Sequence, residues 1–226
     1  MPNELKVIAH IECGFPEKFG IPRQSGMVMT DGRIIMHGEY AKSEAFRGID
    51  GYSHLWLIWG FTGFDNDKFS PTVRPPRLGG NKRVGVFSTR SPNRPNPIGL
   101  SAVELVSVEE AKSGIILNIR GADLKNGTEI YDIKPYLPFT DSHPDAKFGF
   151  SEEKFGKKLN VEFSSEIAVN DEKFLSEIKD ILADDPRPQY QDDGRVYGMS
   201  YRDYEIKFTV DDDTVKVNSI IKENSI

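Results

Sequence analysis

The pattern of apolar and polar positions along the chain predicts mostly β-strands joined by short turns. Residues 5–12 alternate loosely and predict a strand. Residues 53–61 form a continuous apolar run, short enough for a strand buried on both faces. Residues 26–38 predict a pair of strands that turn at Asp31-Gly32. Residues 40–50 predict about two helical turns.

The chain continues as strands up to Pro138. Further strands are predicted at residues 83–90, 100–110, 114–120 and 128–138. Lys112-Ser113-Gly114 and Lys125-Asn126-Gly127 supply the turns between the last three. Because closure of a sheet removes its exposed edges, this succession favours a closed or nearly closed antiparallel sheet. The predicted fold is therefore mainly β, a single-sheet antiparallel β-barrel with a smaller C-terminal α+β lobe.

The C-terminal part differs in composition from the rest. Residues 143–158 contain few branched apolar residues and predict a linker. Strands are predicted beyond it at residues 161–169, 203–210 and 214–220, the last two forming a hairpin. We therefore predict a β-barrel domain over residues 1–149 and an α+β lobe over residues 150–226.

Residues 170–188 carry the one convincing helical pattern of the chain. Asn170 is predicted to cap the helix, and Pro186 follows its end. The apolar stripe that would pack against the sheet consists of Phe174, Ile178, Ile181 and Leu182.

Composition excludes several kinds of site. Cys13 is the only cysteine, so the chain cannot form an internal disulfide. The four histidines have none of the paired spacings typical of zinc sites, which argues against a bound metal. No apolar run approaches the ~20 residues needed to cross a bilayer, and the N-terminus lacks the pattern of a secretory signal. We therefore expect a soluble cytoplasmic protein without a membrane contact.

The charge distribution marks one segment for an anionic partner. The net charge of −6 alone argues against nucleic acid. Residues 68–103, however, contain no Asp or Glu. Their seven basic residues are Lys68, Arg74, Arg77, Lys82, Arg83, Arg90 and Arg94. These charges alternate with Pro and Gly, which an ordinary solvated basic face does not require. This segment is therefore the predicted contact for an anion.

Residues 85–101 form a proline-braced cationic loop. Proline fixes its own φ and biases the preceding residue toward an extended conformation, so the prolines hold Arg94 and Asn96 along a restricted path. Arginine suits forked binding of carboxylate or phosphate. The alternative is a rigid loop that closes the barrel and leaves its arginines in solvent. Standard phosphate-binding, nucleophile and Cys-His motifs are absent from the sequence, so the chemistry is either absent or depends on positioning.

Several motifs together resemble one enzyme family. They are PRQSG at residues 22–26, SHLWLIWGF at 53–61, PTVRPPRLGGNKRVGVFSTRSPNRPNPIGLS at 71–101, DLKNGTEIYDIKPYLPFTDS at 123–142 and DPRPQY at 185–190. Over essentially its whole length the chain resembles the TrmO family of S-adenosylmethionine-dependent tRNA N6-adenine methyltransferases. The resemblance implies a β-barrel that acts as a homodimer. It also implies methylation of N6-threonylcarbamoyladenosine next to the anticodon, chiefly in threonine tRNAs.

The resemblance further implies a set of contacts with S-adenosylmethionine. By position these are Pro22, Arg23, Gln24, Thr62, Gly63, Arg90, Leu100, Gly121, Ala122 and Asp123. Thr62 stands where the family often has histidine, so we expect a backbone contact there rather than a side-chain contact. Asn93 replaces a commonly larger and less polar residue, which affects how the loop packs.

Catalysis is expected to depend on alignment of the methyl donor and acceptor. Alignment can lower the activation barrier by about 7–11 kcal/mol. A general base raises the rate about 10²- to 10⁴-fold, which corresponds to about 3–5 kcal/mol. Asn96 is the candidate acceptor for the adenine N6 hydrogens and Tyr136 the candidate stacking surface, with structural roles for both as the alternative. Lys134 and Arg94 are candidates for binding the threonyl carboxylate. An ion pair of Lys134 with Asp132 is the equal alternative.

The remaining basic residues of the acid-free segment are assigned to tRNA phosphates. They are Arg74, Arg77, Lys82 and Arg83. Two other functions stay open at this point: a noncatalytic RNA-binding barrel that uses the same loop, and an enzyme for a small anionic metabolite. Cofactor-dependent methylation of tRNA separates the enzyme from the first, and competition by bulk tRNA at low salt separates it from the second.

Overall fold

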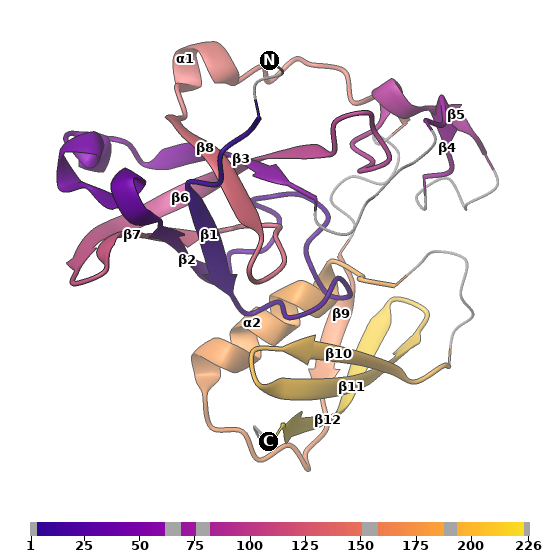
Figure 1. Cartoon of the computed structure of the whole chain (residues 1–226). Helices are drawn as coiled ribbons and strands as arrows, with labels where there is room; N and C mark the ends of the chain where they lie inside the picture. Colours follow the sequence, from indigo (N-terminus) through magenta and orange to yellow (C-terminus); the bar gives the residue numbers. More distant parts are fainter. Residues whose placement is uncertain (1–3, 62–68, 76–81, 151–157, 188–193, 224–226) are drawn as a thin grey trace.

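The computed structural model describes residues 4–61, 69–75, 82–150, 158–187 and 194–223. Two main sheets have separate hydrophobic cores (Figure 1). The larger sheet closes into a barrel, and the smaller sheet packs with one helix into a C-terminal lobe. No helix within these ranges is long and apolar enough to span a membrane.

Within the described residues, the barrel has six antiparallel strands. They are β1 (Ala9–Cys13), β2 (Asp31–Met36), β3 (His54–Gly60), β6 (Ile98–Ala111), β7 (Gly114–Arg120) and β8 (Glu129–Pro135). Neighbouring strands follow the order β1-β2-β7-β6-β3-β8, and β8 pairs back with β1. The predicted closed antiparallel barrel is confirmed.

Strand β3 shows how the barrel core is filled. Leu55, Leu57 and Trp59 point inward and are buried, because alternate side chains of a strand lie on one face. Trp56 and Ile58 point outward and are only half-buried. The prediction that this strand is buried on both faces is therefore wrong for its outer face.

The predicted strand pair that turns at Asp31-Gly32 is also wrong. Both residues lie at the start of β2, where Gly32 is opposite Cys13 of β1 and opposite Ile119 of β7. Pairing on both sides holds this Asp-Gly dipeptide extended, because the sheet contacts outweigh its local preference for a turn.

The predicted helical turns after β2 form three separate 3-10 turns. They are η1 (Gly38–Ala41), η2 (Ser43–Phe46) and η3 (Ile49–Gly51). Gly48 precedes the last of them with φ of 85°. A left-handed residue cannot continue a right-handed helix, and Lys42 between the first two turns is extended, so no continuous helix forms here.

The predicted strand at residues 83–90 is much shorter in the structure. Only β5 (Val84–Gly85) is extended, and it pairs with β4 (Thr72–Val73) in a two-stranded ribbon beside the barrel (Figure 1). The 3-10 turn η5 (Val86–Ser88) follows at once, and Val86 within it is buried.

The lobe contains the predicted helix and hairpin. Its elements are β9 (Asn160–Phe163), α2 (Glu172–Ala183), β10 (Tyr197–Tyr201), β11 (Tyr204–Asp211) and β12 (Thr214–Lys222). The sheet order is β10-β11-β12-β9, with β9 parallel to β12. Strand β10 was not predicted. A further short helix, α1 (Pro138–Asp141), follows the barrel.

Helix α2 begins one residue later than predicted. The side chain of Asp171, not Asn170, accepts a hydrogen bond from the Phe174 N–H (2.9 Å) and caps the helix. The predicted apolar stripe is confirmed, because all four of its side chains are buried in the lobe core: Phe174, Ile178, Ile181 and Leu182.

The segment after β1 joins the barrel to the lobe. Phe15 and Val28 belong to the core cluster of the lobe. The Arg202 N–H donates to the Gly14 carbonyl (2.6 Å). Residues on both sides of the predicted linker therefore share one core. The predicted division between residues 149 and 150 stays a prediction.

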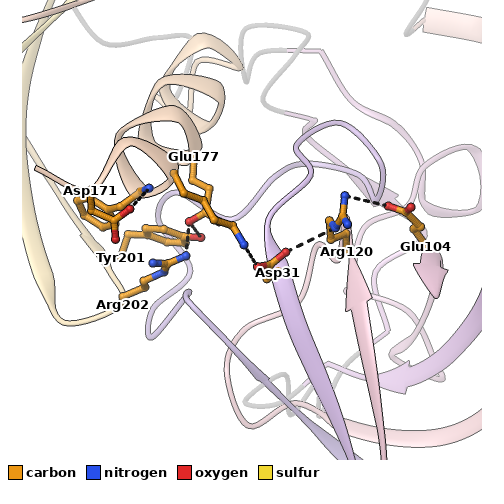
Figure 2. A network of polar contacts seen from close by, with 9 residues as sticks. Asp31, Glu104, Arg120, Asp171, Glu177, Tyr201 and Arg202 are labelled. Atoms are coloured by element: carbon orange, nitrogen blue, oxygen red, sulfur yellow. Dashed lines mark hydrogen bonds and ion pairs between the residues drawn. The ribbon is translucent and has the colours of Figure 1, made fainter. Parts of the chain in front are cut away.

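A polar network lies on the same interface (Figure 2). Glu177 of α2 accepts hydrogen bonds from the Tyr201 hydroxyl (3.0 Å) and from Arg202 (2.5 Å). Lys173 of the same helix forms an ion pair with Asp31 of β2, and Asp31 lies 3.6 Å from the Arg120 guanidinium. The lobe is thus held against the barrel by apolar packing and by charge pairs.

Candidate active site

A cavity of about 500 Å³ lies where β3 ends and β6 begins. Its walls come from four parts of the chain. Among the residues that line it are Pro22, Arg23, Gln24, Trp59, Phe61, Arg90, Arg94, Leu100 and Asp123. Cavities of about 300–1,000 Å³ are typical of small-molecule sites. This cavity is therefore large enough for a small-molecule ligand.

Aromatic side chains form one wall of the cavity. The Trp59 and Phe61 rings lie with centroids 4.3 Å apart. Gly99 of β6 is opposite Trp59 of β3, and a Cβ atom added at Gly99 would lie 2.2 Å from the Trp59 ring. Only glycine therefore leaves room for the indole in this position.

A chain of hydrogen bonds links this wall to a carboxylate. The Trp59 indole N–H donates to Ser101 Oγ (2.9 Å), and the Ser101 hydroxyl donates to Asp123 Oδ1 (2.5 Å). Ser101 is fully buried. Because an indole N–H can only donate, Ser101 Oγ accepts there, and its own hydrogen is directed to Asp123.

The environment of Asp123 acts on its pKa in two directions. Burial raises the pKa of Asp123 above its ordinary value. The hydrogen bond from Ser101, backbone hydrogen bonds and the nearby Arg90 charge oppose this rise. The Ser101 hydroxyl therefore favours the charged carboxylate at the cavity wall.

Six of the residues predicted to contact the cofactor line this one cavity. They are Pro22, Arg23, Gln24, Arg90, Leu100 and Asp123. Gly121 and Ala122 precede Asp123 but are not among the lining residues. Ala122 is buried in the barrel core, and the backbone of Gly121 bonds to Gly26 and Thr30. Thr62 and Gly63 lie outside the described residues.

Two arginines of the cavity also hold neighbouring segments. Arg23 donates to the carbonyls of Asp185 (2.6 Å) and Arg187 (3.2 Å), which follow α2 in the lobe. Arg90 donates to the side-chain oxygen of Gln24. The lobe and the proline-braced loop are therefore both connected to the segment of residues 22–24.

The proline-braced loop is fastened by its own arginine. Arg94 lines the cavity and donates to the carbonyls of Thr89 (2.8 Å) and Val86 (3.3 Å). Asn96 is exposed and is not among the lining residues, and its carbonyl accepts from the Ile98 N–H (2.8 Å). The predicted role of Asn96 as an acceptor for the adenine amine stays a prediction.

Tyr136 and Lys134 lie at the other end of β3. Lys134 of β8 is opposite Trp56, and the Tyr136 N–H donates to the His54 carbonyl (3.0 Å). The Tyr136 ring packs against Trp56, with centroids 5.5 Å apart. Lys134 forms an ion pair with Asp132 (2.8 Å). This ion pair was the predicted alternative to binding of the threonyl carboxylate. Within one chain, neither side chain is brought to the cavity.

The residues predicted to contact phosphate lie on the ribbon of β4 and β5. Arg74 follows β4, and Lys82 and Arg83 precede β5; all three are exposed. Arg83 also donates to the Thr72 hydroxyl (2.7 Å), which fixes it to the opposite strand. Arg77 lies outside the described residues.

Sequence reasoning missed the aromatic wall and the serine behind it. The sequence patterns assign no role to Trp59, Phe61 or Ser101, although all three lie within the family motifs. A tryptophan on the inner face of a strand is a signal for such a wall. Only the register of β3 and β6, however, shows that Trp59 faces Gly99. No cluster of three or more metal-ligating side chains occurs within the described part of the chain.

Comparison with known proteins gives the class and then the family. Residues 10–142 match the family model of the tRNA-methyltransferase O N-terminal domain, and residues 156–223 match that of the TrmO C-terminal domain. These matches cover most of the barrel and most of the lobe, so the chain falls in the class of tRNA methyltransferases. The chain belongs to the TrmO family, as its motifs predicted.

Individual relatives agree with this assignment. The tRNA (adenine(37)-N6)-methyltransferase of Escherichia coli (strain K12) is 39% identical over 92% of this chain and 94% of its own length. A Pseudomonas aeruginosa protein named as an S-adenosylmethionine-dependent methyltransferase is 36% identical over 91% of this chain and 92% of its own. The crystal structure of TrmO from Pseudomonas aeruginosa superposes with a TM-score of 0.79 at 30% identity, covering 98% of both chains.

Proposed function

We propose that this chain transfers a methyl group from S-adenosylmethionine to N6 of adenosine 37 in tRNA. The observation that carries the proposal is the convergence of six predicted cofactor residues on one cavity of a TrmO-family barrel. The names of its relatives support the cofactor and the position of the target base.

The chemistry of the cavity fits S-adenosylmethionine. The cofactor has two cationic groups, a carboxylate, ribose hydroxyls and a flat adenine. Asp123 offers an acceptor to cations or hydroxyls, and Arg90 offers a donor to the carboxylate. Trp59 and Leu100 give apolar surface to the adenine. The volume of about 500 Å³ also suits a ligand of this size.

When bound, S-adenosylmethionine supplies an electrophilic methyl group on a positively charged sulfur. The residues of this chain then have to orient the adenine amine toward it. The rigid loop of residues 85–101 forms one side of the cavity, and Arg94 fastens that loop to its own backbone. Alignment of this kind lowers the activation barrier by about 7–11 kcal/mol, which exceeds the contribution of a general base.

The family resemblance also suggests which modified nucleoside and which tRNA are the substrate. We propose N6-threonylcarbamoyladenosine, chiefly in threonine tRNA, as the target. Its threonyl carboxylate is an anion that unmodified adenosine lacks, and Arg94 is the cationic side chain of the loop that lines the cavity. Lys134 and Tyr136 lie near the first residues of β3, so their proposed roles require the second subunit of the predicted homodimer.

Mass spectrometry of anticodon-loop nucleosides tests the proposal. The protein is incubated with S-adenosylmethionine and threonine tRNA that either carries or lacks the threonylcarbamoyl group. We expect methylated threonylcarbamoyladenosine only from the modified tRNA. Methylation of both tRNAs would refute the specificity for threonylcarbamoyladenosine. Methylation of neither tRNA would refute the proposed methyltransferase activity.

A further inference from the structure

Two phenylalanines lie exposed beside each other on the basic side of the cavity. Phe69 is 55% exposed and Phe87 is 70% exposed. Their ring centroids are 6.3 Å apart, and their planes differ by 28°. Phe69 lies just before β4, and Phe87 lies in η5 just after β5, so the β4–β5 ribbon brings them together. We call Phe69 and Phe87 the aromatic pair.

The aromatic pair adjoins the cavity through Arg94. The Arg94 guanidinium lies 5.4 Å from the centroid of the Phe87 ring. The same side chain lines the cavity and donates to the Val86 carbonyl, the residue before Phe87. One arginine therefore contacts both the proposed cofactor cavity and the exposed ring.

The charge around the aromatic pair selects the kind of partner. The exposed cations Arg74, Lys82 and Arg83 lie on the same ribbon. No Asp or Glu occurs between residues 68 and 103 of the sequence. Exposed aromatic faces flanked by cations are the combination that binds single-stranded nucleic acid, because bases stack while phosphates pair with the cations.

We propose that the aromatic pair is a stacking site for an unpaired base of the RNA substrate, outside the cavity that receives the reacting adenine. This inference rests on the proposed function. A base next to the target in the anticodon loop would stack on Phe69 and Phe87, while its phosphates lie along the β4–β5 ribbon. The site would help to extrude the target adenosine, since a neighbouring base held on the ribbon cannot restack on it.

Binding of an anticodon stem-loop RNA to Phe87→Ala and Phe69→Ala tests the site. Fluorescence anisotropy at two or more salt concentrations gives the dissociation constant and its salt dependence. We expect each variant to weaken RNA binding about tenfold, as loss of base stacking on one aromatic does, with an unchanged salt slope. Arg83→Ala should instead flatten the slope by nearly one unit. Phe87→Trp should restore the affinity.

Matched controls separate this inference from the proposed function. Phe139→Ala removes an equally large ring from α1, where Phe139 is 87% exposed, and it should leave RNA affinity unchanged. Calorimetry should give the same cofactor affinity for Phe87→Ala and wild type. Wild-type methylation together with normal RNA affinity of Phe87→Ala and Phe69→Ala would overturn the stacking site alone. Absence of wild-type methylation would overturn the proposed function, and the binding data would still decide on the stacking site.

The second copy of the chain is the competing occupant of the aromatic pair. Sedimentation of wild type and Phe87→Ala, without RNA, measures this. An unchanged oligomeric state supports the stacking site. Dissociation of the variant would overturn it, because the rings would then belong to a subunit interface.

Discussion

At the scale of single residues, Ser101 controls the carboxylate of the cavity. Its hydroxyl accepts from the Trp59 indole and donates to Asp123. Burial of Asp123 favours the neutral acid, and the bond from Ser101 opposes this effect. We therefore expect Ser101 to be a positioning residue, which acts through Asp123 on the proposed cofactor.

Ser101→Ala should weaken cofactor binding, and the loss should grow as the pH falls. Removal of the donor raises the pKa of Asp123 further, so the carboxylate becomes protonated at a higher pH than in wild type. A hydrogen bond to a charged group is worth about 1.5–3 kcal/mol, so the affinity should fall about tenfold or more. Calorimetric titration of S-adenosylmethionine over a series of pH values measures both effects.

Asp123→Asn is the control for this prediction. The amide has nearly the same shape but no charge, so its lower affinity should not depend on pH in the range where Asp123 titrates. A loss of affinity in Ser101→Ala that is equal at every pH would show that Ser101 acts through packing alone.

At the scale of elements, α2 buries a carboxylate along with its apolar stripe. Glu177 is 6% exposed, and its Oε1 has no hydrogen-bond partner among the described residues. Burial raises the pKa of Glu177, and the ion pair with Arg202 only partly offsets the rise. Folded Glu177 therefore binds its proton more tightly than unfolded Glu177 does. The stability contributed by this group falls as the pH rises through the interval between the two pKa values.

Glu177→Gln should gain stability relative to wild type as the pH rises through this interval. The glutamine keeps an oxygen for Tyr201 and Arg202 but does not ionise, so it avoids the cost of a buried charge. Urea unfolding at a series of pH values measures the difference in free energy of unfolding. Glu166→Gln makes the same charge change at an exposed loop position and serves as the control. A relative loss of stability with rising pH would mean that the Arg202 pair outweighs burial.

At the scale of the whole molecule, the lobe is connected to the cavity by Arg23. This residue of the barrel's N-terminal segment lines the cavity and donates to two carbonyls beyond the end of α2. The segment that follows β1 also packs in the lobe core through Phe15. The lobe therefore helps to fix one wall of the proposed cofactor site.

Arg23→Ala should loosen the lobe as well as the cavity. Loss of the donor to two carbonyls should lower the free energy of unfolding by about 1–3 kcal/mol, and amide hydrogens around residues 184–187 should exchange faster. Arg23→Lys should lose less stability than Arg23→Ala, since the lysine ammonium can still donate to a carbonyl. Arg47→Ala, at an exposed position, is the control. Normal exchange in Arg23→Ala, combined with weaker cofactor binding, would show that Arg23 contacts the cofactor without holding the lobe.

The sequence by itself determined the features that local patterns encode. Period-two alternation and short turns predicted the hairpins β6–β7 and β11–β12, and helical spacing predicted the buried stripe of α2. The motifs also identified the family, because a long match in residue order does not depend on how the chain folds. The cofactor contacts were predicted from their position in the family pattern, and six of them line the cavity.

Only the tertiary structure decided which distant residues meet. Asp31-Gly32 has the composition of a turn, yet pairing with β1 and β7 keeps it extended. The Trp59–Ser101–Asp123 chain joins three separate segments, and Arg23 reaches the lobe 162 positions away. Tyr136 and Lys134 are separated from the cavity by the register of β8 on β3. Such contacts depend on strand register and closure of the barrel, and no local sequence pattern contains this information.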